Sequence, residues 1–153
     1  MGTLVSAFYG CGKSYFSKES KSAIDLEYYD YALLRNCRNP DCPTNYIEAI
    51  IESLSKYQFV FITIRESIRV LVQRLEIPYI LVYPDNTAEC YKEWHDRFFR
   101  RGTVMLWDTV LRNHFGEMIE ELKKDTYALR HYKLQPNEYI DSIIQKESEL
   151  CPP

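Results

Sequence analysis

The sequence predicts an α/β fold, with a mainly parallel sheet of about five strands and helices on both faces. Short apolar runs rich in β-branched and aromatic residues alternate along the chain with longer segments of helical periodicity. One run, FVFITI at 59–64, is apolar without a break, as expected of a strand that is buried on both faces. The alternation of strands and helices at this spacing indicates βαβ units, which produce a parallel sheet between two layers of helices.

Five apolar runs are predicted to form the strands. They are TLVSAFY (3–9), SAIDLE (22–27), FVFITI (59–64), YILVY (79–83) and RHYKL (130–134). In such sheets ligands bind at the carboxyl ends of the strands, so the residues that follow each run are the first candidates for a site.

Helices are predicted between and after these runs. They cover residues 13 to about 20, a segment that begins near Thr44, a segment after the third strand, residues 87–101 and 104–122 on either side of Gly102, and the segment after Pro136. The apolar stripes that mark three of them are Ile47, Ile50, Ile51 and Leu54; Ile68, Leu71, Val72 and Leu75; and Leu106, Val110, Leu111, Phe115, Met118, Ile119 and Leu122. The closing ELCPP is predicted to be a frayed tail.

The length and composition predict a single cytoplasmic domain. With 153 residues and no internal repeat, residues 1–150 are expected to form one domain and residues 151–153 a tail. The formal net charge of -3 argues against a protein that coats nucleic acid, although a local basic cluster can still bind phosphate. Five cysteines without a C-x2-C pair favour reduced thiols, and neither a leader sequence nor a membrane-length apolar run is found. We therefore expect no membrane partner.

Residues 7–14, AFYGCGKS, fit the P-loop pattern G-x-x-x-x-G-K-[ST] except that Ala7 replaces the first glycine. Such a loop needs backbone N–H groups turned inward around a phosphate, glycine where the backbone comes closest, a lysine for the terminal phosphates and a hydroxyl for magnesium. The pattern lies between a predicted strand and a predicted helix, which is the context that the motif requires. The alternative is a strand-to-helix turn that uses glycine for its dihedral freedom and carries an incidental lysine.

Acidic and basic residues follow other predicted strands. Asp25 ends the second strand at the same edge as the loop and could orient a substrate hydroxyl, with Glu27 and Asp30 as neighbours; its alternative role is a cap or a solvated strand end. Arg65 and Arg69 begin the helix after the central strand and could bind phosphate or form ordinary ion pairs.

A basic cluster lies in YKEWHDRFFRRG, residues 91–102. Its spacing places Arg97, Arg100 and Arg101 together on one side of a helix. We expect residues 87–102 to form a helical lid that neutralises a transferred phosphoryl group, with a solvated basic face as the alternative. The third strand has no aspartate at its end, which weakens the case for a motor or switch ATPase.

The order and spacing of these segments resemble a group of small P-loop proteins, often encoded by bacteriophages and other large DNA viruses, that look like nucleoside or nucleotide kinases. The resemblance spans almost the whole chain and rests on AFYGCGKSYF, AIDLEYYDY, NPDCPTNYIEAI, VYPD, YKEWHDRFFRRG and YKLQPNEYIDSII. It implies a three-layer kinase-type P-loop fold, transfer of the ATP γ-phosphoryl group with Mg2+ as cofactor, and the host cytoplasm as the location if the source is viral.

The resemblance also implies the roles of single residues. It matches the nucleotide-binding loop to Gly10, Cys11, Gly12, Lys13, Ser14 and Tyr15, the metal ligand to Ser14, the acceptor-side acid to Asp25, and the lid arginines to Arg97, Arg100 and Arg101. The expected partners are a nucleotide and a small phosphate acceptor, which is a nucleoside, a nucleotide or a modified base in DNA. A nucleotide-binding module with little or no catalysis and a purely structural domain remain as alternatives.

Overall fold

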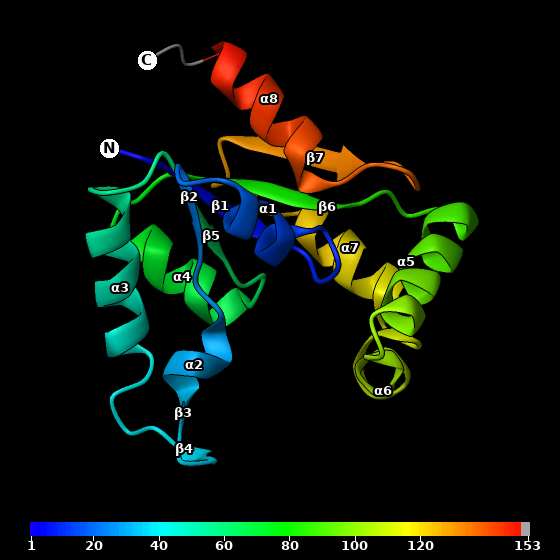
Figure 1. The fold of residues 1–153 in the computed structure, drawn as a ribbon, viewed down its shortest axis with the longest axis horizontal. Coiled ribbons are helices and arrows are strands. Elements are labelled where there is room, and N and C mark those ends of the chain that lie inside the picture. Colours follow the sequence, from blue (N-terminus) through cyan, green and yellow to red (C-terminus); the bar gives the residue numbers. More distant parts are fainter. Residues whose placement is uncertain (151–153) are drawn as a thin grey trace.

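A computed structural model describes residues 1–150 as an α/β fold around a five-stranded parallel sheet (Figure 1). The strands of this sheet are β1 (Thr3–Ala7), β2 (Ala23–Asp25), β5 (Phe59–Ile62), β6 (Tyr79–Pro84) and β7 (Arg130–Leu134), in the order β2-β5-β1-β6-β7. All four neighbouring pairs are parallel, so every strand has its carboxyl end at the same edge. The five predicted strands are confirmed.

Helices cover both faces of the sheet. In Figure 1, α1 (Lys13–Glu19) and α8 (Ile140–Leu150) lie on one face, and α3 (Thr44–Leu54), α4 (Glu66–Arg74) and α7 (Phe115–Lys123) lie on the other. Two parts project beyond these layers: α5 (Ala88–Arg100) with α6 (Val104–Leu106), and α2 (Tyr28–Ala32) with a two-stranded hairpin of β3 (Leu33–Leu34) and β4 (Cys37–Arg38).

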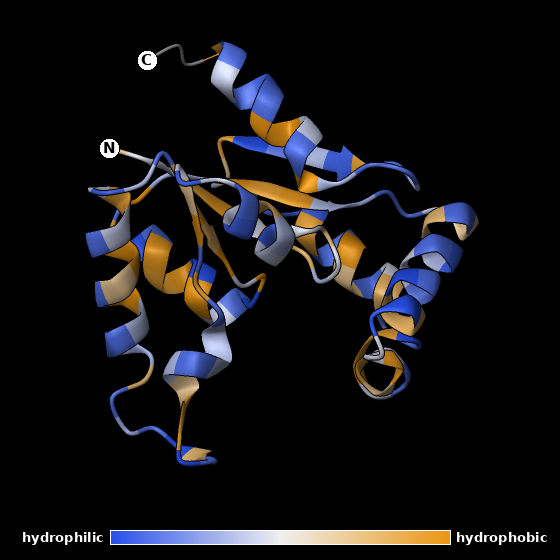
Figure 2. Cartoon of the chain, in the orientation of Figure 1, coloured by the Kyte–Doolittle hydropathy of each residue, from blue (hydrophilic) through white to orange (hydrophobic). Residues whose placement is uncertain are grey.

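The core lies where these layers meet the central strands. Every residue of β5 and β6 is buried, and the residues of β1 after Thr3 are buried too. Figure 2 shows the apolar character of β6 and of the helix faces directed at the sheet. Each large apolar side chain that is fully buried contributes about 1.5–3 kcal/mol, so this layer of strands supplies much of the driving force for folding.

The prediction of one continuous helix over 104–122 is wrong. After the short α6 the chain forms a π-helical turn at Trp107–Leu111, in which the N–H of Arg112 donates to the carbonyl of Trp107 at 2.7 Å, and α7 starts only at Phe115. The physical reason is Trp107, whose buried ring contacts the rings of Tyr91 and Phe115 with centroids 5.0 and 5.7 Å apart. Packing of one large aromatic residue therefore outweighs the regular helical stripe.

Two smaller expectations are also corrected. The segment after β2, for which the sequence predicts no regular element, forms α2 and the β3–β4 hairpin. The hairpin turn places Arg35 and Asn36 at φ of 51° and 63°, a region that asparagine tolerates better than most residues. In the predicted tail, Glu149 and Leu150 belong to α8, whereas Cys151, Pro152 and Pro153 lie outside the described residues.

Candidate functional site

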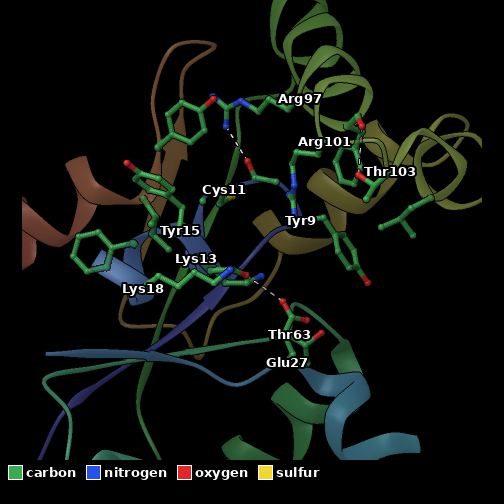
Figure 3. A pocket seen from close by; sticks show the side chains of 18 of the residues that line it. Tyr9, Cys11, Lys13, Tyr15, Lys18, Glu27, Thr63, Arg97, Arg101 and Thr103 are labelled. Atoms are coloured by element: carbon green, nitrogen blue, oxygen red, sulfur yellow. Dashed lines mark hydrogen bonds between the residues drawn. The ribbon is translucent and has the colours of Figure 1, made fainter. Parts of the chain in front are cut away.

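A cavity of about 1080 Å³ opens at the carboxyl edge of the sheet (Figure 3). It lies beside the end of β1, the central strand, which has β5 and β2 on one side and β6 and β7 on the other. Ligands of open α/β sheets bind at such a switch point. The lining combines the loop after β1, the segments after β2 and β5, the end of α5 with the segment after it, and the start of α8.

Most of the predicted site residues meet at this cavity. Its lining includes Gly10, Cys11, Gly12, Lys13, Ser14, Tyr15, Arg97, Arg100 and Arg101. Asp25 is not among the lining residues, whereas its neighbour Glu27 is. From the sequence, Asp25 was the expected acceptor-side acid and Glu27 only its neighbour.

The loop between β1 and α1 depends on glycine at two positions. Gly10 and Gly12 have φ values of 74° and 94°, which L side chains rarely adopt. A methyl group at Gly10 would lie 3.2 Å from the ring of Phe98, and one at Gly12 would lie 3.1 Å from the ring of Tyr139. The loop is therefore packed closely against α5 and against the start of α8.

Hydrogen bonds from outside the loop fix three of its carbonyl groups. The indole of Trp94 donates to the carbonyl of Tyr9 at 2.8 Å, the guanidinium of Arg97 to that of Gly10 at 3.0 Å, and the N–H of Ile140 to that of Cys11 at 2.9 Å. In a planar trans peptide the N–H points opposite to the C=O. The N–H groups that follow these carbonyls are therefore turned away from α5 and α8.

Seven consecutive N–H groups of this loop, from Tyr9 to Tyr15, donate to no protein acceptor within residues 1–150. Such a run of unpaired N–H groups around glycines forms a concavity suited to an anion. Lys13 and Tyr15 line the same cavity, and Cys11, which also lines it, is buried. Burial raises the pKa of the Cys11 thiol to about 12, which leaves it protonated.

The Lys13 ammonium group folds back over the loop and donates to the carbonyl of Ala7 at 2.9 Å. Figure 3 shows Lys13 between two groups of side chains, with Arg97 and Arg101 on one side and Thr63 and Glu27 on the other. Lys13 therefore lines the same cavity as the loop residues whose N–H groups are unpaired.

Ser14 joins the loop to β2. Its hydroxyl donates to Oδ2 of Asp25 at 2.6 Å and lies 3.4 Å from Oε1 of Glu27. The second oxygen of Asp25, Oδ1, is buried and has no hydrogen-bond partner. Hydroxyl and carboxylate oxygens are the ligands that Mg2+ prefers, and Mg2+ is commonly held by one or two carboxylates while it retains water. Within residues 1–150 no cluster of three or more metal-binding side chains is found, so a site here would be of this sparse type.

The three predicted lid arginines lie in different surroundings. Arg97 is 3% exposed; its guanidinium lies 3.9 Å from the ring centroids of both Trp94 and Tyr139. Besides the carbonyl of Gly10 it binds Glu93 at 3.1 Å and the carbonyls of Pro136 and Glu138 at 2.8 and 2.7 Å. Four of its five N–H donors are thus occupied by the protein, and Arg97 holds the loop, α5 and the β7–α8 connection together.

Arg100 and Arg101 remain at the surface of the cavity. Arg100 forms an exposed ion pair with Glu93 at 3.2 Å. The guanidinium of Arg101 lies 5.9 Å from the ring centroid of Phe98, and no ion pair in the described part of the chain includes it. Gly102 follows with φ of 70° and open space around it. These two arginines are the exposed positive charges of the predicted lid.

The two arginines after β5 also have different roles. Arg69 is buried and pairs with Asp125 at 3.1 Å, away from the cavity. Arg65 lines the cavity, with its guanidinium 4.5 Å from the ring centroid of Tyr28 and 5.3 Å from that of Tyr29. Burial raises the pKa of the nearby Tyr9 phenol, and the charge of Arg65 partly opposes this rise. These tyrosines were not predicted as site residues; the signal was the aromatic LEYYDY directly after the acid at the end of β2.

The fold and cavity define an α/β protein whose glycine-containing loop after the central strand borders a large cavity at the carboxyl edge of the sheet. No protein-family model matches the chain, and no curated protein and no solved structure match it significantly. Within residues 1–150, no helix has the length and apolar character needed to cross a membrane.

Proposed function

We propose that the protein is an ATP-dependent phosphotransferase with a kinase-type P-loop, which transfers the γ-phosphoryl group to a nucleoside, a nucleotide or a modified DNA base. The observation that carries the proposal is the loop of unpaired N–H groups next to Lys13 and to the Ser14–Asp25 hydrogen bond. The cavity supports it too: its volume of about 1080 Å³ lies at the upper end of the range of about 300–1,000 Å³ for ligand pockets, which is compatible with a nucleotide and an acceptor.

Each part of the site has a role in this reaction. The loop N–H groups and the ammonium of Lys13 bind the terminal phosphates, and Arg100 and Arg101 approach them from α5. Arg97 acts through the loop as a positioning residue. Ser14 and Asp25 would hold Mg2+, which supplies charge neutralisation at the phosphates when bound. In the transfer the acceptor oxygen bonds to the γ-phosphorus, the bridging bond to the β-phosphate breaks, and its electron pair leaves with ADP.

The acceptor is expected on the side of Glu27. This carboxylate lines the cavity, whereas that of Asp25 is directed at Ser14. We assign to Glu27 the orientation of the acceptor hydroxyl, whose proton leaves towards this carboxylate. Catalysis then depends on positioning and on charge neutralisation.

The test is transfer of label from γ-labelled ATP with Mg2+ to a panel of nucleosides, nucleoside monophosphates and duplex DNA containing hydroxymethylated bases. We expect transfer to one class of acceptor and a loss of at least about 100-fold in the Lys13→Ala protein, because a charge-assisted contact to the phosphoryl group is removed. Lys21→Ala is the matched control, since Lys21 is exposed and lies outside the cavity lining. A folded Lys13→Ala protein with undiminished transfer would exclude this mechanism.

A second candidate is a nucleotide-binding module without catalysis. Two of the three predicted lid arginines are already bound to Glu93, which reduces the free positive charge at the lid. This candidate predicts that ATP with Mg2+ raises the melting temperature while no product forms. If ATP with Mg2+ does not raise the melting temperature, both candidates fail and the domain is structural.

A further inference from the structure

Arg65 is a half-buried cation without an anionic partner. It lines the cavity, and none of the ion pairs within residues 1–150 includes it. Its terminal NH2 group donates to the hydroxyl of Tyr29 at 2.7 Å, while its Nε is buried and has no hydrogen-bond partner. A guanidinium in this state has lost part of its hydration and has gained only one neutral hydrogen bond in return.

The other arginines that are withdrawn from solvent have their charge compensated. Arg69 pairs with Asp125, Arg97 with Glu93, and Arg130 with Glu147. Arg65 differs from them because, within residues 1–150, it contacts two tyrosine rings and forms no ion pair. The two rings fix the guanidinium without neutralising it, so its charge is available to a ligand in the cavity.

The position of Arg65 separates it from the groups that would bind ATP. It follows Thr63, which lies with Glu27 on the side of Lys13 opposite to Arg97 and Arg101 (Figure 3). Tyr28 and Tyr29, which contact Arg65, directly follow Glu27 in the chain. Arg65 therefore belongs to the half of the cavity in which the acceptor is expected.

We propose that Arg65, which packs against Tyr28 and Tyr29, binds a phosphate group of the acceptor, so that the substrate is nucleotide-like and carries its own phosphate in addition to the hydroxyl that is phosphorylated. That this substrate accepts the γ-phosphoryl group of ATP rests on the proposed function, whereas the binding of its own phosphate by Arg65 does not. Guanidinium groups bind phosphate through paired N–H donors, and the exposed ring of Tyr29 offers a face for a planar base. The phosphate can come from a free mononucleotide or from a DNA backbone.

The test measures binding by calorimetry with ADP and Mg2+ at saturation, so that the loop after β1 is already occupied. The probes are the four deoxynucleoside 5′-monophosphates, the four parent deoxynucleosides and a short single-stranded oligodeoxynucleotide. The variants are Arg65→Met, which keeps an unbranched stem against the tyrosines, Arg65→Lys, which keeps the charge, and Arg74→Met as the control, because Arg74 is exposed and outside the cavity lining.

We expect a phosphate-bearing probe to bind about 10- to 100-fold more tightly than the parent nucleosides, and Arg65→Met to remove this difference. Arg65→Lys should retain part of it and Arg74→Met all of it, with unchanged melting temperatures. Preference for the mononucleotide or for the oligonucleotide supports the inference in either case and identifies the source of the phosphate. Equal binding of nucleosides and phosphate-bearing probes, or an Arg65→Met protein that binds like the wild type, would overturn it.

The outcome is distinguishable from that of the proposed function. If Arg65-dependent phosphate binding is found but no label is transferred from ATP, the inference stands and the proposed transfer fails. If label is transferred to unphosphorylated nucleosides, and Arg65→Met does not change KM for the acceptor, the proposed function stands and the inference fails.

Discussion

At Cys11 the backbone and the side chain have separate roles. Its carbonyl is held by the N–H of Ile140, its own N–H is unpaired, and its thiol is packed in the core with 1% exposure. The prediction that Cys11 belongs to the nucleotide-binding loop therefore concerns its backbone. The thiol belongs to the buried core, which is a role that no spacing of residues in the sequence indicates.

The pKa of Cys11 leads to a prediction about its reactivity. Because burial raises this pKa to about 12, the thiolate that reacts with alkylating reagents is absent at neutral pH. In the folded protein we expect iodoacetamide to modify the exposed Cys37 and to leave Cys11 unmodified until the chain is denatured. Mass spectrometry of native and denatured samples measures this, and Cys90, which is also buried, is the internal comparison. Modification of native Cys11 at the rate of Cys37 would contradict the described packing.

At the scale of elements, the sequence predicted helix α5 correctly but not the surroundings of all its arginines. Its existence, its bounds within one or two residues and the break before Gly102 are confirmed. The expectation that all three arginines face one ligand is not supported for Arg97, which lies in the buried stripe of Cys90, Trp94 and Phe98. The signal was present, because residues 90, 94, 97 and 98 follow the spacing of one helix face, but a charged residue is rarely assigned to such a face.

The role of Arg97 can be tested through stability. Replacing it by methionine leaves Glu93 without its buried partner and frees three backbone carbonyls. We expect Arg97→Met to lower the free energy of unfolding by about 3 kcal/mol or more and to weaken the stabilisation by ATP with Mg2+. Arg100→Met is the control, since Arg100 binds the same carboxylate at the surface, where ion pairs contribute little. Denaturant titration measures the free energy of unfolding of both variants. Equal losses would contradict the role of Arg97 in holding the loop, α5 and the β7–α8 connection together.

The elements that the sequence predicted are those with a local signal. The five strands and the stripes of α3 and α4 follow from runs and periods that need no knowledge of tertiary contacts. The π-helical turn at Trp107–Leu111 and the β3–β4 hairpin lack such a signal. The first depends on aromatic neighbours from α5 and α7, and the second is only two residues long in each strand. Arg65 was predicted as a candidate phosphate ligand, but its contact with Tyr28 was not, because these two residues meet only in the fold.

At the scale of the whole molecule, two ion clusters join the layers of the fold. Arg130 of β7 binds the buried carboxylate of Glu147 in α8 through two hydrogen bonds of 2.7 and 2.6 Å, and Tyr132 donates to it as well. Arg69 of α4 and Tyr79 of β6 bind Asp125, which follows α7. Each cluster connects a helix to the sheet with charges that are partly or fully withdrawn from water.

These clusters predict how stability depends on pH. Burial alone would raise the pKa of Glu147, but the hydrogen bonds from Arg130 and Tyr132 outweigh it and lower the pKa below the ordinary 4.5. The folded state then binds fewer protons than the unfolded state, so the contribution is present above pH 4.5 and is lost as the pH falls through the lower folded value. We expect the free energy of unfolding to fall more steeply between pH 5 and 3 in the wild type than in Glu147→Gln. Denaturant titrations at several pH values check this, and parallel curves would contradict it.

The fixed carbonyls of the loop after β1 have a further consequence. Trp94 and Arg97 of α5, and Ile140 of α8, hold the loop in the shape that leaves its N–H groups unpaired. The attachment of α5 and α8 to the loop favours the binding of a ligand to these N–H groups. Because coupling free energies are reciprocal, such a ligand strengthens the attachment of α5 and α8 by the same factor. Displacement of the whole of α5 would break the hydrogen bonds from Trp94 and Arg97 to the loop and would therefore weaken the binding of such a ligand.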